Sequence, residues 1–265
     1  MTKLTINPAN MEGVLLDTQK DLITMAERNK CNGFAQELHD QFTNPNLYSQ
    51  MDFVERVKRC FSVQEEFTSI ARFNTLFKTS RLTKKLYIKQ FCPDPSRGLD
   101  ADTLLIFKDC NYIKEGTNVV ISGPTGTGKT ALATAAGVEA LQKGYTVAFY
   151  RMSDFCALIE SKDPIGLARF RKRLKNVKCL ILDDYGLTTL SDKVVAELNE
   201  IADVRYGLGS TIITSQLKKN GLKTLIAKSP IRDALADRLF RASDVEITLS
   251  GASWRGSANE LKGAK

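Results

Sequence analysis

The sequence is poor in the residues that build metal centres and covalent cross-links. Its 265 residues include one histidine, His39, and six cysteines, no two of which form a CxxC pair. A structural zinc site needs clustered thiolate and imidazole ligands, so this scatter argues against zinc. The cysteines are expected to be reduced, mostly buried thiols. His39 has no partners for a catalytic triad and is expected to be a partly exposed helix residue.

Long apolar runs are missing as well. No stretch approaches the length needed to span a membrane, and the N-terminal residues MTKLTINPANMEG lack the hydrophobic segment of a signal peptide. Apolar residues make up 43% and charged residues 26% of the chain, which is typical of a soluble globular protein. These features predict a cytoplasmic location and no membrane partner.

Basic residues outnumber acidic ones, 38 to 30, which gives a net charge of +8. Such an excess favours an anionic macromolecular partner. The excess is also uneven, because the first 50 residues are slightly acidic whereas residues 56–89 and 169–178 are rich in Lys and Arg.

The chain is expected to contain two domains joined by a linker. Residues 11–30 and 52–77 place apolar side chains at roughly helical spacing, so residues 1–80 are predicted to form a small α-helical domain. Residues 81–98 are basic and contain two prolines, which indicates a linker or an ordered loop. The basic segment 79–89 could also lie along a nucleic-acid backbone.

Residues 99–265 alternate between strand-like and helix-like patterns, the signature of an α/β fold with a parallel sheet flanked by helices. Gly144 is expected to end one helix, Ser191 to cap a second and Ser229-Pro230 to begin a third. The predicted strands are Val119–Ser122, Thr146–Tyr150, Cys179–Asp183, Thr211–Thr214 and Val245–Leu249.

The segment GPTGTGKT matches the phosphate-binding pattern GxxxxGK[ST] in full. It follows an apolar β-branched run and precedes an alanine-rich helical segment, which is the strand–loop–helix setting that the pattern requires. Lys129 is expected to reach the β- and γ-phosphates of ATP or GTP, and the Thr130 hydroxyl is expected to ligate Mg²⁺. The residues predicted to hold the nucleotide are Gly123, Pro124, Thr125, Gly126, Thr127, Gly128, Lys129, Thr130 and Ala131.

Two carboxylates, Asp183 and Asp184, follow a strand that reads as buried on both faces. Ligands bind at this edge of a parallel sheet, so Asp183 is predicted to hold Mg²⁺. Asp184 falls where many ATPases carry a glutamate that polarises the attacking water, and its shorter side chain leaves its reach to that water open. The alternative is a turn cap after a core strand.

Two further polar residues are candidates for catalysis. Gln216 follows the next strand and could contact the γ-phosphate or its water, unless it belongs to an ordinary strand-end turn. Arg238 lies in a segment rich in apolar residues. It could form a salt bridge with Asp233 or Asp237, or project into the nucleotide of a neighbouring subunit.

Five motifs in order, GPTGTGKT, LILDDYG, YGLGSTIITSQL, ADRL and GASWRG, resemble the AAA+ ATPases of the IstB/DnaC group. The sequence is most similar to the IstB-like transposition helper proteins of insertion sequences. The resemblance covers residues 98–256 and is weak in the N-terminal part. It implies that Gln216 is sensor 1, that Arg238 is an arginine finger acting in trans, and that Arg255 contacts the nucleotide. Arg205 would lie at a subunit interface or in a surface salt bridge.

The resemblance also implies the biochemistry. The expected protein is an ATPase with ATP and Mg²⁺ as cofactors, which assembles as a homo-oligomer on double-stranded DNA and stimulates a transposase. About 27 residues follow Arg238, too few for the usual helical lid domain, so hydrolysis should depend on assembly as well as on DNA. Three alternatives remain open: a DnaC-like loader of a replicative helicase, a nucleotide-switched DNA-coating filament with little hydrolysis, and a small-molecule P-loop kinase.

Two basic regions are candidates for contacts with DNA phosphates, which are independent of base sequence and weakened by salt. One is the insert between the second and third strands, which could form a basic helix, and the other is the loop after Gln216. A solvated surface is the alternative for both. The candidate contacts are Lys162, Arg169, Lys172, Arg173, Lys175, Lys218 and Lys219.

Overall fold

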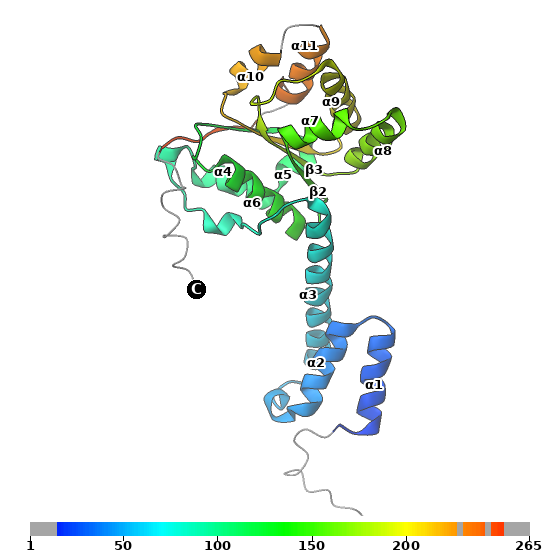
Figure 1. Ribbon diagram of the computed structural model, residues 1–265. Helices are drawn as coiled ribbons and strands as arrows, with labels where there is room; N and C mark the ends of the chain where they lie inside the picture. Colours follow the sequence, from blue (N-terminus) through cyan, green and yellow to red (C-terminus); the bar gives the residue numbers. More distant parts are fainter. Residues whose placement is uncertain (1–14, 227–229, 242–244, 252–265) are drawn as a thin grey trace, which may run out of the picture. The chain divides into compact units, whose positions relative to one another are not determined.

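The computed structural model describes residues 15–226, 230–241 and 245–251. The chain divides into two compact units, Met1–Asn74 and Thr75–Lys265. The long helix α3 (Phe53–Ser80) runs from the first unit into the second (Figure 1). Each unit has its own packing and is described by itself.

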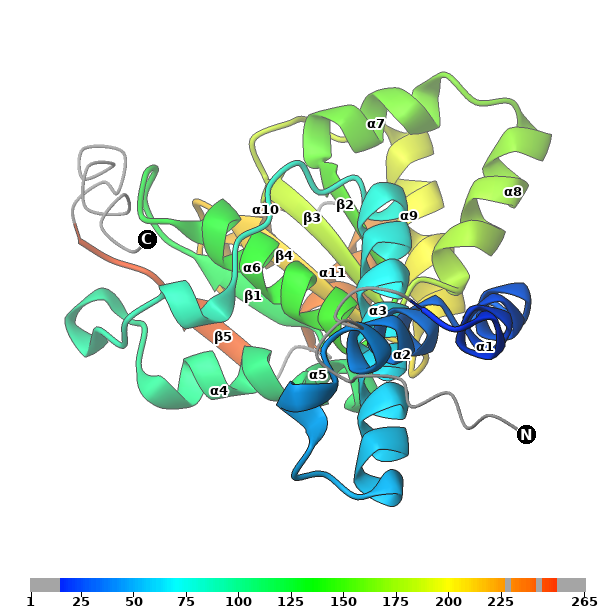
Figure 2. The same ribbon diagram turned by 90° about the horizontal axis from the view of Figure 1, so that it is seen from below.

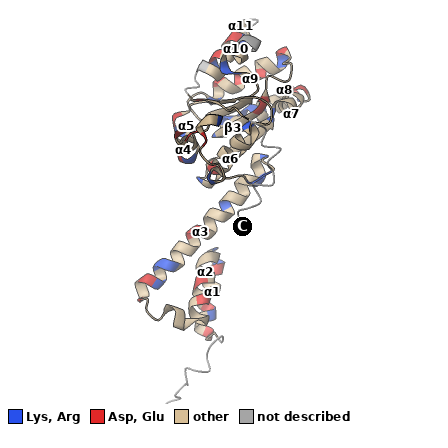
Figure 3. Cartoon of the chain, turned by 90° about the vertical axis from the view of Figure 1, so that its left-hand side faces the viewer, with Lys and Arg blue, Asp and Glu red and all other residues tan. Residues whose placement is uncertain are grey.

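The first unit is helical, as the apolar spacing predicts. It contains α1 (Asp17–Arg28), α2 (Asn32–Thr43), the 3₁₀ turn η2 (Pro45–Tyr48) and the first part of α3. Gly33 lets α2 approach α3 closely, because a Cβ there would lie 2.8 Å from the Val63 carbonyl oxygen. Gln64 accepts hydrogen bonds from the backbone of Gly33 and Phe34, at 2.9 and 3.1 Å. α3 carries both basic and acidic side chains along its length (Figure 3).

The second unit holds a parallel five-stranded sheet in the order β2-β3-β4-β1-β5. Helices α4, α5 and α6 cover one face, and α7 and α9 cover the other (Figures 1 and 2). The strands are β1 (Val119–Ser122), β2 (Val147–Arg151), β3 (Cys179–Tyr185), β4 (Ser210–Ser215) and β5 (Val245–Thr248). The helices are α4 (Ala101–Asp109), α5 (Asn111–Glu115), α6 (Lys129–Gln142), α7 (Met152–Glu160), α8 (Pro164–Lys175), α9 (Asp192–Arg205), α10 (Lys219–Ile226) and α11 (Pro230–Ala236), with the π-helical turn η5 (Asp237–Arg241).

The predicted α/β fold is therefore confirmed, and the strand boundaries differ from the prediction by at most two residues. β1 and β4 are buried along their whole length, because helices cover both faces of the sheet. β3 continues past its predicted end to Tyr185, through an irregularity between Leu182 and Tyr185. Ser191 caps α9 by accepting a hydrogen bond from the backbone of Val194.

Residues 81–98, expected to be a linker or an ordered loop, belong to the sheet-bearing unit and pack within it. The segment contains two 3₁₀ turns, η3 (Ile88–Gln90) and η4 (Pro95–Arg97). Leu82 and Ile88 are buried, and Leu82 lies against Gly137 of α6. The sequence did not reveal this packing because the basic residues and prolines of the segment indicated a linker, whereas the burial of Leu82 depends on its contact with the distant Gly137.

Arg205 is neither at the surface nor in a surface salt bridge, so that expectation was wrong. Its side chain is buried, and the guanidinium donates to the carbonyl oxygens of Leu174 and Val177 at 2.7 and 2.5 Å and to that of Ser210 at 2.7 Å. Burial lowers the pKa of Arg205 to about 10. The side chain thus joins the end of α8 to the start of β4. None of the helices in the described ranges has the length and apolar character of a membrane span.

We expect Arg205→Ala to lower the stability of the sheet-bearing unit by about 3 kcal/mol, because it removes three hydrogen bonds that a charged, buried donor makes to carbonyl oxygens. A loss of that size in a unit of this length lowers the melting temperature by about 6–12 °C. Thermal denaturation measures the change. Arg169→Ala, at an exposed position of α8, is the matched control and should change stability by less than about 0.5 kcal/mol. Equal melting temperatures for Arg205→Ala and the control would contradict the role assigned to Arg205.

Candidate functional site

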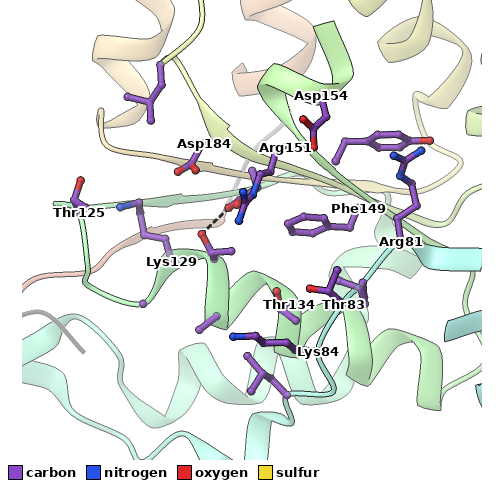
Figure 4. A pocket seen from close by; sticks show the side chains of 18 of the residues that line it. Arg81, Thr83, Lys84, Thr125, Lys129, Thr134, Phe149, Arg151, Asp154 and Asp184 are labelled. Carbon is purple, nitrogen blue, oxygen red and sulfur yellow. Dashed lines mark hydrogen bonds between the residues drawn. The ribbon is translucent and has the colours of Figure 1, made fainter. Parts of the chain in front are cut away.

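A cleft of about 940 Å³ opens beside the phosphate loop, at the carboxyl ends of β2 and β3 (Figure 4). One end is formed by the loop, the start of α6 and the two carboxylates after β3. The other end is formed by the segment 81–86 together with Phe149 and Tyr150 of β2 (Figure 4). The sheet edge that the sequence predicted as the ligand site is therefore hollowed.

Three glycines give the phosphate loop its shape. Gly123, Gly126 and Gly128 have φ values of +146°, +89° and +97°, which residues other than glycine rarely adopt. A Cβ at Gly123 would also lie 2.2 Å from the carbonyl oxygen of Leu249. Glycine is therefore required in the loop for two reasons: the backbone has positive φ values, and the loop at Gly123 lies too close to the chain after β5 for a side chain.

Lys129 lies folded into the loop. Its side chain is buried, and Nζ donates to the carbonyl oxygens of Gly123 and Pro124, both at 2.8 Å. Phosphate oxygens accept stronger, charge-assisted hydrogen bonds from an ammonium group than carbonyls do. When a phosphate binds in the loop, the ammonium can therefore exchange its neutral carbonyl acceptors for charged phosphate oxygens.

Asp183 is the most constrained polar residue of the site. Its Oδ1 accepts hydrogen bonds from the Thr130 hydroxyl at 2.9 Å and from the Thr214 hydroxyl at 2.6 Å. Its Oδ2 is buried and has no hydrogen-bond partner in the described part of the chain. Burial raises the pKa of Asp183, and the hydrogen bonds from Thr214 and Thr130 offset part of that rise.

Asp184 has a left-handed backbone conformation, with φ of +58°. Its backbone N–H donates to the Thr214 hydroxyl at 2.9 Å, and its half-buried carboxylate lines the cleft. This hydroxyl therefore holds the Asp183 carboxylate and the backbone of Asp184, since it also donates to Asp183. Non-glycine residues rarely adopt this conformation, and here it turns the second carboxylate towards the phosphate end of the cleft.

The other predicted catalytic residues lie in different places. Gln216 is exposed and lines the cleft together with the loop. Arg238 does not line it; its Nε is bonded to the Asp203 carboxylate of α9, and its Nη1 lies 3.5 Å from the Asn199 side-chain oxygen. The alternative named Asp233 or Asp237 as its salt-bridge partner, whereas the ion pair observed is with Asp203. Arg255 lies outside the described residues.

The candidate DNA contacts of the insert lie on or next to α8. Arg169, Lys172, Arg173 and Lys175 are exposed. Arg173 also donates to the Tyr150 hydroxyl at 2.5 Å, and Lys162 lies over the ring of Phe170. After Gln216, Lys218 is exposed and Lys219 is half-buried at the start of α10.

Sequence reasoning missed several polar residues that line the cleft, among them Arg81, Lys84 and Arg151, and it missed Thr214, whose hydroxyl bonds to Asp183. Arg81 and Lys84 were assigned to a linker, and the guanidinium of Arg81 lies 4.7 Å from the ring centroid of Tyr150. Arg151 pairs in register with Asp183 across the β2–β3 ladder. The sequence placed Arg151 directly after a predicted strand, at the sheet edge where ligands bind. Only the pairing of β2 with β3 shows that Asp183 is the residue opposite Arg151.

The residues present fit a magnesium nucleotide. No group of three histidine, cysteine or carboxylate residues that could hold a metal occurs in the described ranges, so an all-protein metal cage is absent there. Mg²⁺ in nucleotide sites is bound by one or two protein oxygens together with phosphate oxygens and water. The Thr130 hydroxyl and the unpartnered Oδ2 of Asp183 supply such oxygens beside the glycine loop.

Comparison with known proteins gives consistent matches. A family model described as IstB-like ATP binding protein matches residues 24–261. The insertion sequence ATP-binding protein y4pL of Sinorhizobium fredii (strain NBRC 101917 / NGR234) is 37% identical over 160 residues, which cover 60% of this chain and 65% of that protein. The insertion sequence IS1162 ATP-binding protein of Pseudomonas fluorescens is 30% identical over 190 residues, which cover 71% and 82%.

A solved structure is also similar. It shows the replication initiator DnaA bound to AMPPCP and single-stranded DNA, with a TM-score of 0.53 and 27% identity over 64% of this chain and 52% of that chain. The expected AAA+ fold is thereby confirmed.

The raised pKa of Asp183 predicts an unusual pH dependence for the nucleotide-free protein. Because the folded pKa lies above the unfolded value of about 3.9, the folded state binds the proton more tightly than the unfolded chain does. The penalty for the charged form is absent below the unfolded pKa and is complete above the folded pKa. Asp183→Asn removes it, so the melting temperature of the variant relative to wild type should rise between pH 4 and pH 7.

The control is Asp154→Asn, which removes an exposed carboxylate from the same cleft. A change of its melting temperature with pH equal to that of Asp183→Asn would assign the effect to the loss of one negative charge from the cleft. A constant difference for Asp183→Asn would show that the Asp183 carboxylate carries no burial penalty.

Proposed function

Because the chain belongs to the family of IstB-like ATP-binding proteins, we propose that it is an ATP-hydrolysing helper of transposition. In this proposal ATP drives its assembly into a homo-oligomer on double-stranded DNA, and the assembly stimulates a partner transposase. The two relatives described above are named for insertion sequences, which favours a transposase over a replicative helicase as the partner. The observation that carries the proposal is that a phosphate cleft and a helix with exposed, unpaired basic side chains occur in the same unit.

Each residue of the cleft has a defined part in ATP hydrolysis. Lys129 exchanges the carbonyl oxygens of Gly123 and Pro124 for phosphate oxygens, and the backbone N–H groups of the loop and of the α6 N-terminus bind the remaining phosphate oxygens. Thr130 and Asp183 would hold Mg²⁺, which neutralises the charge that develops on the phosphates. Asp184 and Gln216 would orient the water that attacks the terminal phosphate.

The basic side of α8 is the surface proposed to bind DNA. The helix contains no acidic residue within Pro164–Lys175. Arg171 is paired with Glu197 at 3.2 Å, and Arg173 is bonded to Tyr150. Arg169, Lys172 and Lys175 form no ion pair or hydrogen bond with the described residues. Three solvated cations on one helix suit contact with successive phosphates, which requires no base reading.

Assembly is proposed to complete the catalytic site. Arg238 lies outside the cleft of its own chain and is held by Asp203 in a partly exposed ion pair. An exposed pair of this kind contributes only about 0–1 kcal/mol, so a stronger anionic partner can replace it. In the proposed oligomer that partner is the terminal phosphate in the neighbouring subunit.

Removing the three unpaired cations tests the DNA surface. We expect the triple variant Arg169→Ala, Lys172→Ala, Lys175→Ala to bind duplex DNA more weakly. Each phosphate contact contributes about 0.9 to the slope of log K against log salt, so the slope should fall by about 2–3. Fluorescence anisotropy with a labelled duplex, measured with ATP at several salt concentrations, gives both quantities.

A second triple variant removes the same charge from the opposite side of the sheet: Lys108→Ala, Lys114→Ala, Lys143→Ala. It should lower affinity only slightly and leave the slope nearly unchanged. Equal slopes for both variants would assign the effect to net charge alone and would contradict a binding surface on α8.

We expect Arg238→Ala to retain ATP binding and to lose most turnover, because its guanidinium acts on the nucleotide of another subunit. Mixing it with Asp183→Ala, which keeps its arginine but lacks the carboxylate, should restore phosphate release. Failure of every mixing ratio to restore turnover would contradict action in trans. If the wild-type protein bound ATP but released no phosphate with or without duplex DNA, the nucleotide-switched filament would be favoured instead. That alternative is suggested by Asp184, whose side chain is shorter than the glutamate that many ATPases carry at this position.

A further inference from the structure

The cleft contains a cation that no nucleotide-binding motif of the sequence supplies. Arg151 ends β2 and lines the cleft together with Lys129, Asp183 and Gln216. In the parallel ladder between β2 and β3, Arg151 is paired with Asp183. Residues paired in this way lie on neighbouring strands about 4.8 Å apart and point to the same face of the sheet. The arginine therefore rises on the side of the sheet that carries the phosphate loop.

The side chain of Arg151 is exposed to the cleft. Burial raises the pKa of the neighbouring Asp183 carboxyl, and the positive charge of Arg151 offsets part of that rise. It forms no ion pair and no hydrogen bond with the described residues. Figure 4 shows it beside the hydrogen bond that joins Thr130 to Asp183, at the phosphate end of the cleft. Its neighbour Asp154 lines the same cleft without pairing with it.

The geometry points to Arg151 as a contact for the terminal phosphate of ATP from within the same chain. A guanidinium offers donors that match phosphate oxygens, and this one stands beyond the loop, on the side where a third phosphate would extend. Lys129 reaches from the loop side, so the two cations would approach the terminal phosphate from different directions. Arg151 would thus distinguish ATP from ADP before any neighbouring subunit is present. This inference rests on the proposed function.

The arrangement separates Arg151 from the other arginine of the cleft. Arg81 lies over the ring of Tyr150, at the end of the cleft formed by residues 81–86. Both arginines raise the positive potential of the cleft, but only Arg151 is paired across the β2–β3 ladder with Asp183. Arg81→Ala is therefore the matched control for a general electrostatic effect.

The test compares the dissociation constants of ATP and ADP, measured by calorimetry with and without Mg²⁺ on dilute, DNA-free protein. We expect Arg151→Ala to raise the dissociation constant of ATP about tenfold or more and that of ADP less than about threefold, because a charge-assisted hydrogen bond to the third phosphate is lost. Arg151→Lys should recover part of the ATP affinity. Arg81→Ala should change both nucleotides by similar, small factors.

Equal weakening of ATP and ADP by Arg151→Ala, or no weakening of either, would overturn the inference. Lys129→Ala is the comparison variant, because loss of that residue should weaken the binding of both nucleotides. Failure of the wild-type protein to bind ATP would refute the proposed function itself, and is thus a different result. In steady-state turnover, a rise of KM for ATP with little change in the KD for ADP would agree with a contact to the terminal phosphate.

Discussion

The buried carboxylate of Asp183 joins the three parts of the phosphate site. Its Oδ1 accepts hydrogen bonds from Thr130 on the first turn of α6 and from Thr214 at the end of β4. Asp183 itself stands near the end of β3, so a single side chain links the loop and helix to two neighbouring strands. A buried carboxylate is unfavourable unless hydrogen bonds or a cation compensate it. Since Oδ2 lacks a partner among the described residues, the protein's own side chains satisfy this charge only in part.

Lys129 shows how the free protein keeps its second buried charge available. If its ammonium were paired with Asp183, a phosphate would have to break an ion pair in order to bind. Instead the ammonium is bonded to the carbonyl oxygens of Gly123 and Pro124, which are neutral acceptors and weaker partners than phosphate oxygens. Lys129 and the Asp183 carboxylate thus line the same cleft, and a phosphate can replace the two carbonyl acceptors of the lysine. The site retains its capacity for an anion beside Lys129 and for a cation beside Asp183.

Much of the fold could be predicted from the sequence, because its signals are local. The buried parallel strands are short apolar runs with polar ends, and Ser191 and Gly144 mark helix ends by their own chemistry. The phosphate loop is a contiguous segment of eight residues, so its position followed from the pattern alone. The IstB resemblance was equally accessible, since it depends on five short motifs in order, and the family match over residues 24–261 confirms it.

The parts that sequence reasoning missed depend on contacts between distant residues. Arg205 reads as a surface arginine until the carbonyl groups around it are known, and Leu82 reads as part of a linker until Gly137 makes room for it. The case of Arg151 is sharper, because it depends on strand register. A shift of one residue would turn its side chain to the opposite face of the sheet, away from Asp183. Motifs identify the loop and the carboxylates, but only the ladder between β2 and β3 shows that Arg151 lies beside Asp183 in the same cleft.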